Sequence, residues 1–255
     1  MSIKSKVLAA AATLTLVSGV GMAGALTAGP AAAATPSCGN SCVNTFNQDI
    51  GFGFSVDVYR QGEKVGQPII LFRTSNFDPA LDWSMAFNGL VSDFFAAGLV
   101  SAAVNLHYGC NSAGGACLSG VFPDLPAFEI EYAPFGVNSG LCMGVAATAF
   151  QGEGVTLQPC GVSSKTVWIV DSSDSPANDN QVYPGTFPLI NGSDTNFSHP
   201  FVLTYPGNAY PTDKPRPQIT VTNLTGFAQP GNGGVLPIIG TVNSAQLWFQ
   251  ALGTF

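Results

Sequence analysis

The sequence predicts an all-β fold made of three similar units, and three observations support this. The only three tryptophans, Trp83, Trp168 and Trp248, are spaced 85 and 80 residues apart, and near-equal spacing is typical of an internal repeat. Segments that alternate apolar and polar residues precede them, as half-buried strands do. Charged residues make up only 9% of the chain while 30 residues are Gly, so helix formers are scarce and turn formers common.

The first 34 residues are expected to be a signal peptide. Lys4 and Lys6 form a basic start, an apolar run rich in Ala and Gly covers residues 7–26, and the alanines at 32–34 supply small residues for cleavage. We therefore expect a secreted, extracellular protein without membrane insertion, whose mature residues 35–255 form a single domain. A retained membrane anchor is the alternative interpretation.

The mature chain is acidic and contains all six cysteines. Six basic residues face fifteen acidic ones, a net charge of −9 without a basic cluster, which argues against a nucleic-acid partner. An even number of cysteines in an oxidising compartment predicts disulfides. A metal site is disfavoured because CxxC pairs are absent, and the two histidines, His107 and His199, are not spaced with the cysteines as zinc ligands. We expect no cofactor.

Each predicted unit contains an apolar strand, a Gly- or Pro-marked turn, a second strand and the closing tryptophan. These segments are 54–83, 140–168 and, in a looser form, 214–226 followed by 243–248. A further alternating strand is expected ahead of each unit, at 42–47, 128–132 and 201–205. Four strands per unit, repeated three times, close into a barrel with paired edges. The prediction is a β-trefoil with lobes at about 38–90, 126–171 and 200–255.

Two long insertions separate these lobes, at about 91–125 and 172–199. The first begins with the apolar segment 91–109, which we interpret as additional strand. The stretch 171–200 is rich in Asp, Asn, Ser, Gly and Pro, which predicts a surface loop with several turns.

The segment 141–168 resembles a repeat of the ricin B-type lectins. LCMGV matches the family's LC-x-D-V strand, VTLQPC its V-x-L-x-x-C strand and KTVW its Q-x-W motif, and the likeness extends more loosely over 54–83. This resemblance implies a β-trefoil in which Cys142 pairs with Cys160. The whole mature chain also resembles a group of secreted actinobacterial proteins of unassigned role.

The other four cysteines are assigned by proximity alone. Cys38 and Cys42 would tie down the mature N-terminus, and Cys110 and Cys117 would close a hairpin tip, although six cysteines permit fifteen pairings.

The resemblance also implies a sugar site in the first lobe. The family binds a sugar through a strand Asp that accepts hydrogen bonds from two hydroxyls and an aromatic ring that stacks on the sugar face. Asp57 and Phe72 match these positions, although Ile70, Ala80 and Leu81 replace polar ones. The alternatives are an Asp57 carboxylate that accepts backbone N–H groups or pairs with Arg60 or Lys64, and a Phe72 ring that belongs to the core.

The other two lobes are weaker candidates for sugar binding. Gly144 and Gln158 stand at the acidic and aromatic positions of the second lobe, so its sugar site is expected to be lost. The third lobe keeps Gln246 of the Q-x-W motif, but no Asp aligns there.

An enzyme is not expected, because no nucleophile elbow, metalloprotease motif or phosphate-binding glycine loop is present. Glu129 and Glu131 share one face of a strand, about 7 Å apart, and could serve as acid and base. We favour a solvated strand face instead. The acidic run 171–180 could bind calcium, but a polar surface turn is favoured.

The sequence therefore predicts a non-catalytic carbohydrate-binding module whose partner is a glycan or cell-surface polysaccharide. The alternative is an extracellular protein-interaction or inhibitor module that has lost sugar binding. Loop aromatics such as Phe122, Tyr183 and Phe187 would then contact a protein partner.

Overall fold

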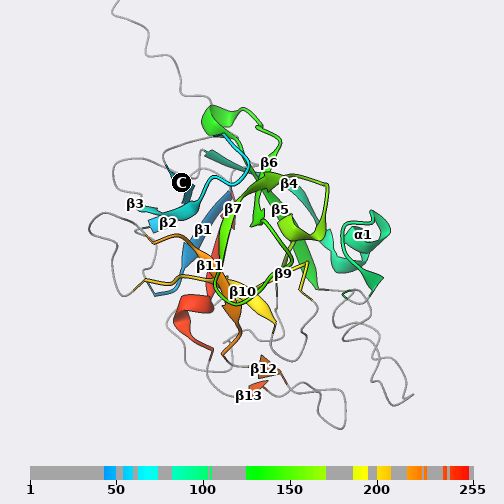
Figure 1. The fold of residues 1–255 in the computed structure, drawn as a ribbon, viewed down its shortest axis with the longest axis vertical. Coiled ribbons are helices and arrows are strands. Elements are labelled where there is room, and N and C mark those ends of the chain that lie inside the picture. The colour runs from blue at the N-terminus through cyan, green and yellow to red at the C-terminus, as the bar shows by residue number, and fades with distance from the viewer. Residues whose placement is uncertain are drawn as a thin grey trace, which may run out of the picture. The chain divides into compact units, whose positions relative to one another are not determined.

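The structure is a computed structural model that describes residues 43–49, 54–59, 63–73, 82–102, 104, 125–170, 186–194, 200–207, 217–225, 227–228, 238–239 and 242–252. Figure 1 shows the described strands, and twelve of these fourteen fall into three sets of four. Lobe 1 contains β1 (Val43–Asn47), β2 (Phe54–Val58), β3 (Ile69–Arg73) and β4 (Trp83–Leu90). Lobe 2 contains β5 (Pro126–Tyr132), β6 (Leu141–Val145), β7 (Glu153–Pro159) and β8 (Trp168–Val170). Lobe 3 contains β9 (Leu189–Asn191), β10 (Phe201–Thr204), β11 (Thr220–Asn223) and β14 (Trp248–Leu252), with a short hairpin of β12 (Phe227–Ala228) and β13 (Ile238–Ile239) inserted.

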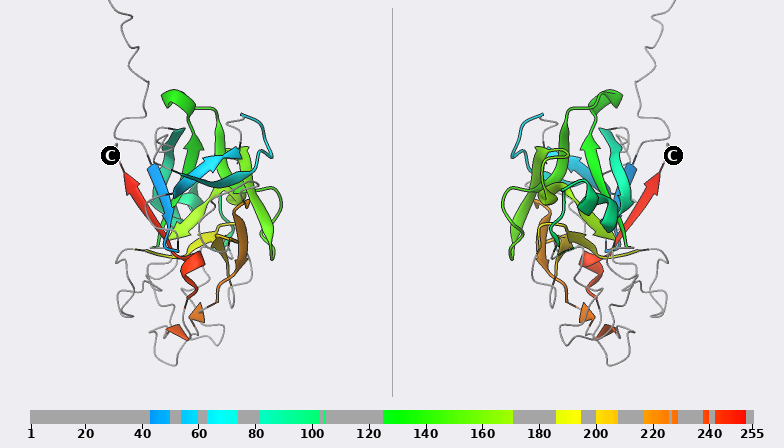
Figure 2. Two further views of the ribbon diagram at one scale, coloured as in Figure 1. Left: turned by 90° about the vertical axis from the view of Figure 1, so that its left-hand side faces the viewer. Right: turned by 90° about the vertical axis from the view of Figure 1, so that its right-hand side faces the viewer.

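The last strand of each lobe pairs with the first strand of the next. β4 pairs with β5, β8 with β9, and β14 with β1, all antiparallel. The last of these pairings joins the two ends of the described chain, and β1 and β14 lie side by side in Figure 2. The three lobes are thus linked in a closed ring, so these strand edges are paired.

The second and third strands of each lobe form a hairpin, and the three hairpins contact one another in the same cyclic way. Leu157 N donates to Gln67 O (2.9 Å), Val155 N to Ile219 O (2.7 Å), and Ile219 N to Ile69 O (2.9 Å). Three hairpins on a ring of three strand pairs define a β-trefoil, so the predicted fold class is confirmed.

The three tryptophans occupy equivalent places in the core. Each is buried, and each indole Nε1 donates to a backbone carbonyl in the second strand of its own lobe. The pairs are Trp83 with Val56 (3.1 Å), Trp168 with Met143 (2.9 Å) and Trp248 with Leu203 (2.7 Å). Burial of a large aromatic side chain stabilises the fold, and the indole N–H needs a partner there. The tryptophan spacing therefore did mark a structural repeat.

The third lobe begins earlier than expected. Residues 189–191 were predicted to lie in a surface loop, but they form β9, a fully buried strand paired with β8. The segment 201–204, expected as the first strand, is instead the second, because the carbonyl of its Leu203 accepts the Trp248 indole. A strand of three residues in a polar stretch is too short to show the alternation of apolar and polar residues that predicts a strand.

The start of the first insertion is helical, so the predicted strand there is wrong. Helix α1 (Val91–Ala96) buries Val91 and Phe94, three residues apart on one helical face. The Asp93 carboxylate accepts the Leu90 N–H at 2.8 Å, which satisfies a free donor at the helix start. The helix packs its buried residues into a second apolar cluster with Ala127 and Ile169.

Cys38, Cys42, Cys110 and Cys117 lie outside the described residues, as do His107, His199, Phe122, Tyr183 and the run 171–180. Within the described ranges, no helix is both long and apolar enough to cross a membrane.

Candidate functional site

The indole hydrogen bonds fix which residues correspond between lobes. Val56, Met143 and Leu203 are equivalent, so the next residues, Asp57, Gly144 and Thr204, occupy one position in the three lobes. The ladders place Phe72, Gln158 and Thr222 at the equivalent position of the third strands. These two positions are where the ricin B-type resemblance locates the sugar ligands.

Asp57 lies in β2 opposite Ile70 and is completely buried, with 0% exposure. Its Oδ1 accepts the Val58 N–H at 2.6 Å, as in the alternative of a carboxylate that accepts backbone N–H groups. Phe72 stands opposite Ser55, two residues along from Ile70, so the register puts the two candidate positions close together. The side chain of Phe72 lies outside the described residues. A ligand hydroxyl could reach Asp57 only after neighbouring atoms moved.

The equivalent position in lobe 2 is sterically closed. A Cβ on Gly144 would meet Lys165 O at 2.7 Å and Thr166 Cγ2 at 2.9 Å, closer than real Cβ contacts. Gln158 donates to Thr156 Oγ1 at 2.8 Å within its own hairpin. Lobe 2 therefore has neither a carboxylate at this position nor space for one.

The equivalent position in lobe 3 belongs to a closed polar network. Gln246 Nε2 donates to Thr222 Oγ1 (2.9 Å) and Asn223 O (2.8 Å), while its Oε1 accepts from Thr225 N and Thr225 Oγ1, both at 2.9 Å. Thr204 Oγ1 lies 2.7 Å from Thr222 Oγ1. All donors and acceptors of the Gln246 amide are used, so a sugar would have to break existing bonds here.

The residue that pairs with each tryptophan, on the first strand of the next lobe, is Asn in two cases and Tyr in the third. The pairs are Trp83 with Tyr132, Trp168 with Asn191, and Trp248 with Asn47. Both asparagines donate from Nδ2 to the carbonyl three residues before the tryptophan, which is Lys165 O (3.0 Å) or Ala245 O (2.9 Å). Their Oδ1 atoms accept the N–H two residues along, at 3.1 and 3.0 Å. Asn at this position has the same scaffold role twice, and Tyr132 departs from it.

Tyr132 is fully buried and its ring packs edge-on against Trp83, with ring centroids 5.4 Å apart. Its hydroxyl has no hydrogen-bond partner in the part of the chain that the structure describes, an arrangement that costs about 1–3 kcal/mol. Burial raises the pKa of the phenol well above its usual value. Three carboxylates raise this pKa further, in the order Asp82, Asp57 and Glu63.

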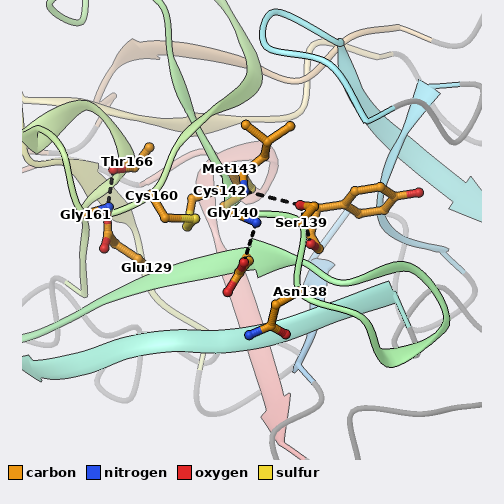
Figure 3. The surroundings of a disulfide bond; sticks show 12 residues. Glu129, Asn138, Ser139, Gly140, Cys142, Met143, Cys160, Gly161 and Thr166 are labelled. Carbon is orange, nitrogen blue, oxygen red and sulfur yellow. Dashed lines mark hydrogen bonds between the residues drawn. A yellow bond between two sulfur atoms is a disulfide. The ribbon is translucent and has the colours of Figure 1, made fainter. Parts of the chain in front are cut away.

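Glu129 and Glu131 are buried, so the predicted solvated strand face is wrong. Glu131 Oε1 accepts the Gly140 N–H at 2.6 Å. Glu129 Oε1 accepts the Gly161 N–H at 3.1 Å and the Thr166 hydroxyl, and Figure 3 shows the latter three residues together. The carboxylates cap backbone donors left open by the turns at the two glycines. They serve the scaffold, and nothing in their contacts indicates an acid and base pair.

The two capped turns lie next to the disulfide of lobe 2. Cys142 and Cys160 are bonded, with Cα atoms 5.0 Å apart, which confirms the pairing implied by the resemblance (Figure 3). Cys160 N also donates to Gly140 O at 3.0 Å, so the covalent bond and the ladder fix the same end of the β6–β7 hairpin.

Phe187 is not an isolated loop aromatic. Its backbone exchanges two 2.9 Å hydrogen bonds with Trp248, and its side chain is half-buried. Among the described residues, His, Cys, Asp and Glu side chains do not gather in threes as metal ligands.

Comparison with protein families finds no match, and comparison with curated proteins finds none either. Among solved structures, the chain is similar to the designed three-fold symmetric protein ThreeFoil, at 12% identity and a TM-score of 0.43, covering 82% of this chain and 97% of that one. It is also similar to a mosquitocidal holotoxin, at 13% identity and a TM-score of 0.46, covering 85% of this chain and 18% of that one. These likenesses are low, and the fold assignment rests on the threefold hydrogen-bond pattern described above.

Proposed function

We propose that this protein is a secreted, non-catalytic binding module and that its ligand is a carbohydrate bound by lobe 1. One observation carries the proposal: of the three equivalent position pairs, only that of lobe 1 holds a carboxylate and an aromatic residue, Asp57 and Phe72, two rungs apart on the β2–β3 ladder. A carboxylate accepts from two sugar hydroxyls and a flat ring packs on the apolar sugar face. Lobe 2 is closed at Gly144 and lobe 3 is occupied by its own network.

A glycan array tests this proposal. We expect the mature protein to bind a defined subset of glycans, and Asp57→Asn to lose that binding. Asp49→Asn is the matched control, because Asp49 is an exposed acid on the turn after β1. Absence of binding to every glycan refutes carbohydrate recognition. Binding that Asp57→Asn leaves unchanged refutes lobe 1 as the site.

A second function, recognition of a protein partner, is supported by burial and exposure. The complete burial of Asp57 makes sugar access costly, whereas Val137 and Val162 are 66% and 71% exposed. Both lie on the turns that Glu131 and Glu129 cap beside the disulfide. The two turns neighbour each other, since Cys160 N donates to Gly140 O, and exposed apolar side chains on neighbouring turns favour contact with another protein.

Replacement of both valines distinguishes this second function from the first. Val137→Lys with Val162→Lys should abolish capture of an envelope protein and leave glycan binding unchanged. Val65→Lys, at a 58% exposed position on the lobe 1 turn, is the matched control. Capture that survives the double substitution excludes this surface.

A further inference from the structure

Lobe 1 differs from the other two lobes at three equivalent positions. Asp57 stands where the other lobes have Gly144 and Thr204. Asp82, directly before Trp83, stands where the other lobes have the buried apolar residues Val167 and Leu247. Tyr132 stands where the other lobes have Asn191 and Asn47. Two lobes fold without these groups, so a lobe of this trefoil can be built without them.

The three residues converge on one place through Trp83. The indole of Trp83 donates to Val56 O, directly before Asp57. Trp83 follows Asp82 in the chain, and its ring packs on Tyr132. Ala133 N, directly after Tyr132, donates to Asp82 O at 2.7 Å. The carboxylates of Asp82 and Asp57 are close enough to Tyr132 to raise the pKa of its phenol.

We propose that Asp57, Asp82 and Tyr132 form a buried subsite for the ammonium group of an amino sugar. This subsite extends the carbohydrate site proposed above and presupposes that function. An ammonium has three N–H donors, and the subsite offers one oxygen acceptor from each residue. Each carboxylate accepts more than one hydrogen bond, so existing contacts of the two aspartates can persist.

The charge of the subsite selects an ammonium over a neutral hydroxyl. The buried Asp57 and Asp82 and the exposed Glu63 each raise the pKa of the Tyr132 phenol, and a low-dielectric site strengthens the attraction of such carboxylates for a cation. The Tyr132 hydroxyl, which has no hydrogen-bond partner among the described residues, gains an N–H donor when the amine binds. An acetylated amine is neutral and keeps only one N–H, so it fits this subsite poorly.

The test measures binding of D-glucosamine, N-acetyl-D-glucosamine and D-glucose to the mature, disulfide-bonded protein by calorimetry at pH 6. We expect glucosamine to bind at least tenfold more tightly than the other two sugars. Tyr132→Phe and Asp82→Asn should each weaken glucosamine binding at least tenfold. Tyr205→Phe is the matched control, because Tyr205 is a buried tyrosine of lobe 3, and it should leave binding unchanged.

The outcomes separate the subsite from the general function. Equal affinity for all three sugars, or glucosamine binding that Tyr132→Phe does not weaken, overturns the subsite and leaves carbohydrate recognition standing. A protein that binds none of these sugars and no glycan on an array overturns both. Urea unfolding of each variant checks that it is folded, and Tyr132→Phe is expected to fold at least as well as the native protein because it removes an unpartnered hydroxyl.

Discussion

Replacing Gly144 tests whether lobe 2 can hold any side chain at the position equivalent to Asp57. In Gly144→Ala, the new Cβ would lie 2.7 Å from the backbone carbonyl of Lys165 and 2.9 Å from Thr166 Cγ2. The carbonyl belongs to the 3-10 turn Ser164–Thr166 that leads into Trp168. Relief of this contact would therefore shift a turn that positions a core tryptophan.

The magnitude follows from two opposing effects. Overpacking of a core costs about 1–3 kcal/mol, and Ala in place of Gly in a strand returns about 0.5–1 kcal/mol. We expect Gly144→Ala to lower the free energy of unfolding by about 1–2 kcal/mol and Gly144→Asp to lower it more, because its carboxylate would face the Lys165 carbonyl. In a domain of this size each kcal/mol lowers the Tm by about 2–4 °C.

Urea unfolding followed by tryptophan fluorescence measures this loss, with an unchanged m-value showing that two-state behaviour is kept. Gly66→Ala is a useful comparison, because Gly66 has open space around it but a φ of +83°, so its cost comes from the backbone alone. Thr166→Ser in the Gly144→Ala background removes the Cγ2 contact and should recover part of the stability. A Gly144→Ala protein as stable as the native one would show that lobe 2 has room for a side chain, and the argument for a closed site would fail.

Three further predictions concern stability. The double variant Cys142→Ser/Cys160→Ser should lose about 3 kcal/mol, since the bridge closes a loop of 18 residues; an equal midpoint in urea with and without the bridge would contradict this. Gln246→Leu should lose about 1–3 kcal/mol because it removes the hydrogen bonds of a buried amide to Thr222, Asn223 and Thr225, while leucine at the exposed Gln151 should cost little. The pKa of Tyr132 is raised in the folded protein, so ionisation of this phenol does not affect the free energy of unfolding below the unfolded-state pKa of about 10. Above that pH, the free energy of unfolding falls by about 1.4 kcal/mol per pH unit. Tyr132→Phe should flatten this fall between pH 10 and 11.5, and an unchanged slope would be evidence against the buried phenol.

The repeat was predictable because its strongest signals are local. Tryptophan spacing marked the three lobes, and the motif around Cys142 and Cys160 marked the best preserved one. Helix α1 was missed because an apolar Ala- and Phe-rich run fits strand and helix periods alike. The i, i+3 spacing of Val91 and Phe94, with Asp93 three residues after Leu90, was the available signal.

The candidate site was only partly predictable. Asp57 and Phe72 came from the family resemblance, and the register does place their positions close together. The sequence predicts Tyr132 only as one residue of an alternating strand. Its departure from the Asn found at this position in the other two lobes is visible only in comparison with Asn47 and Asn191. An alignment of the first strands of the three lobes, β1, β5 and β9, could have revealed it. Glu129 and Glu131 accept N–H groups from turns outside their own strand, and strand alternation alone does not show these contacts.

The pairing of β1 with β14 has a consequence for how the chain is made. Asn47 Nδ2 donates to Leu247 O, 200 residues further along, so a nascent chain cannot close its ring of strands until β14 has been synthesised. Contacts of such long sequence separation form late and slowly. Until then β1 lacks its partner strand and the ring of strand pairs stays open. A chain that stops before β14 would leave β1 as an exposed edge that other chains could pair with.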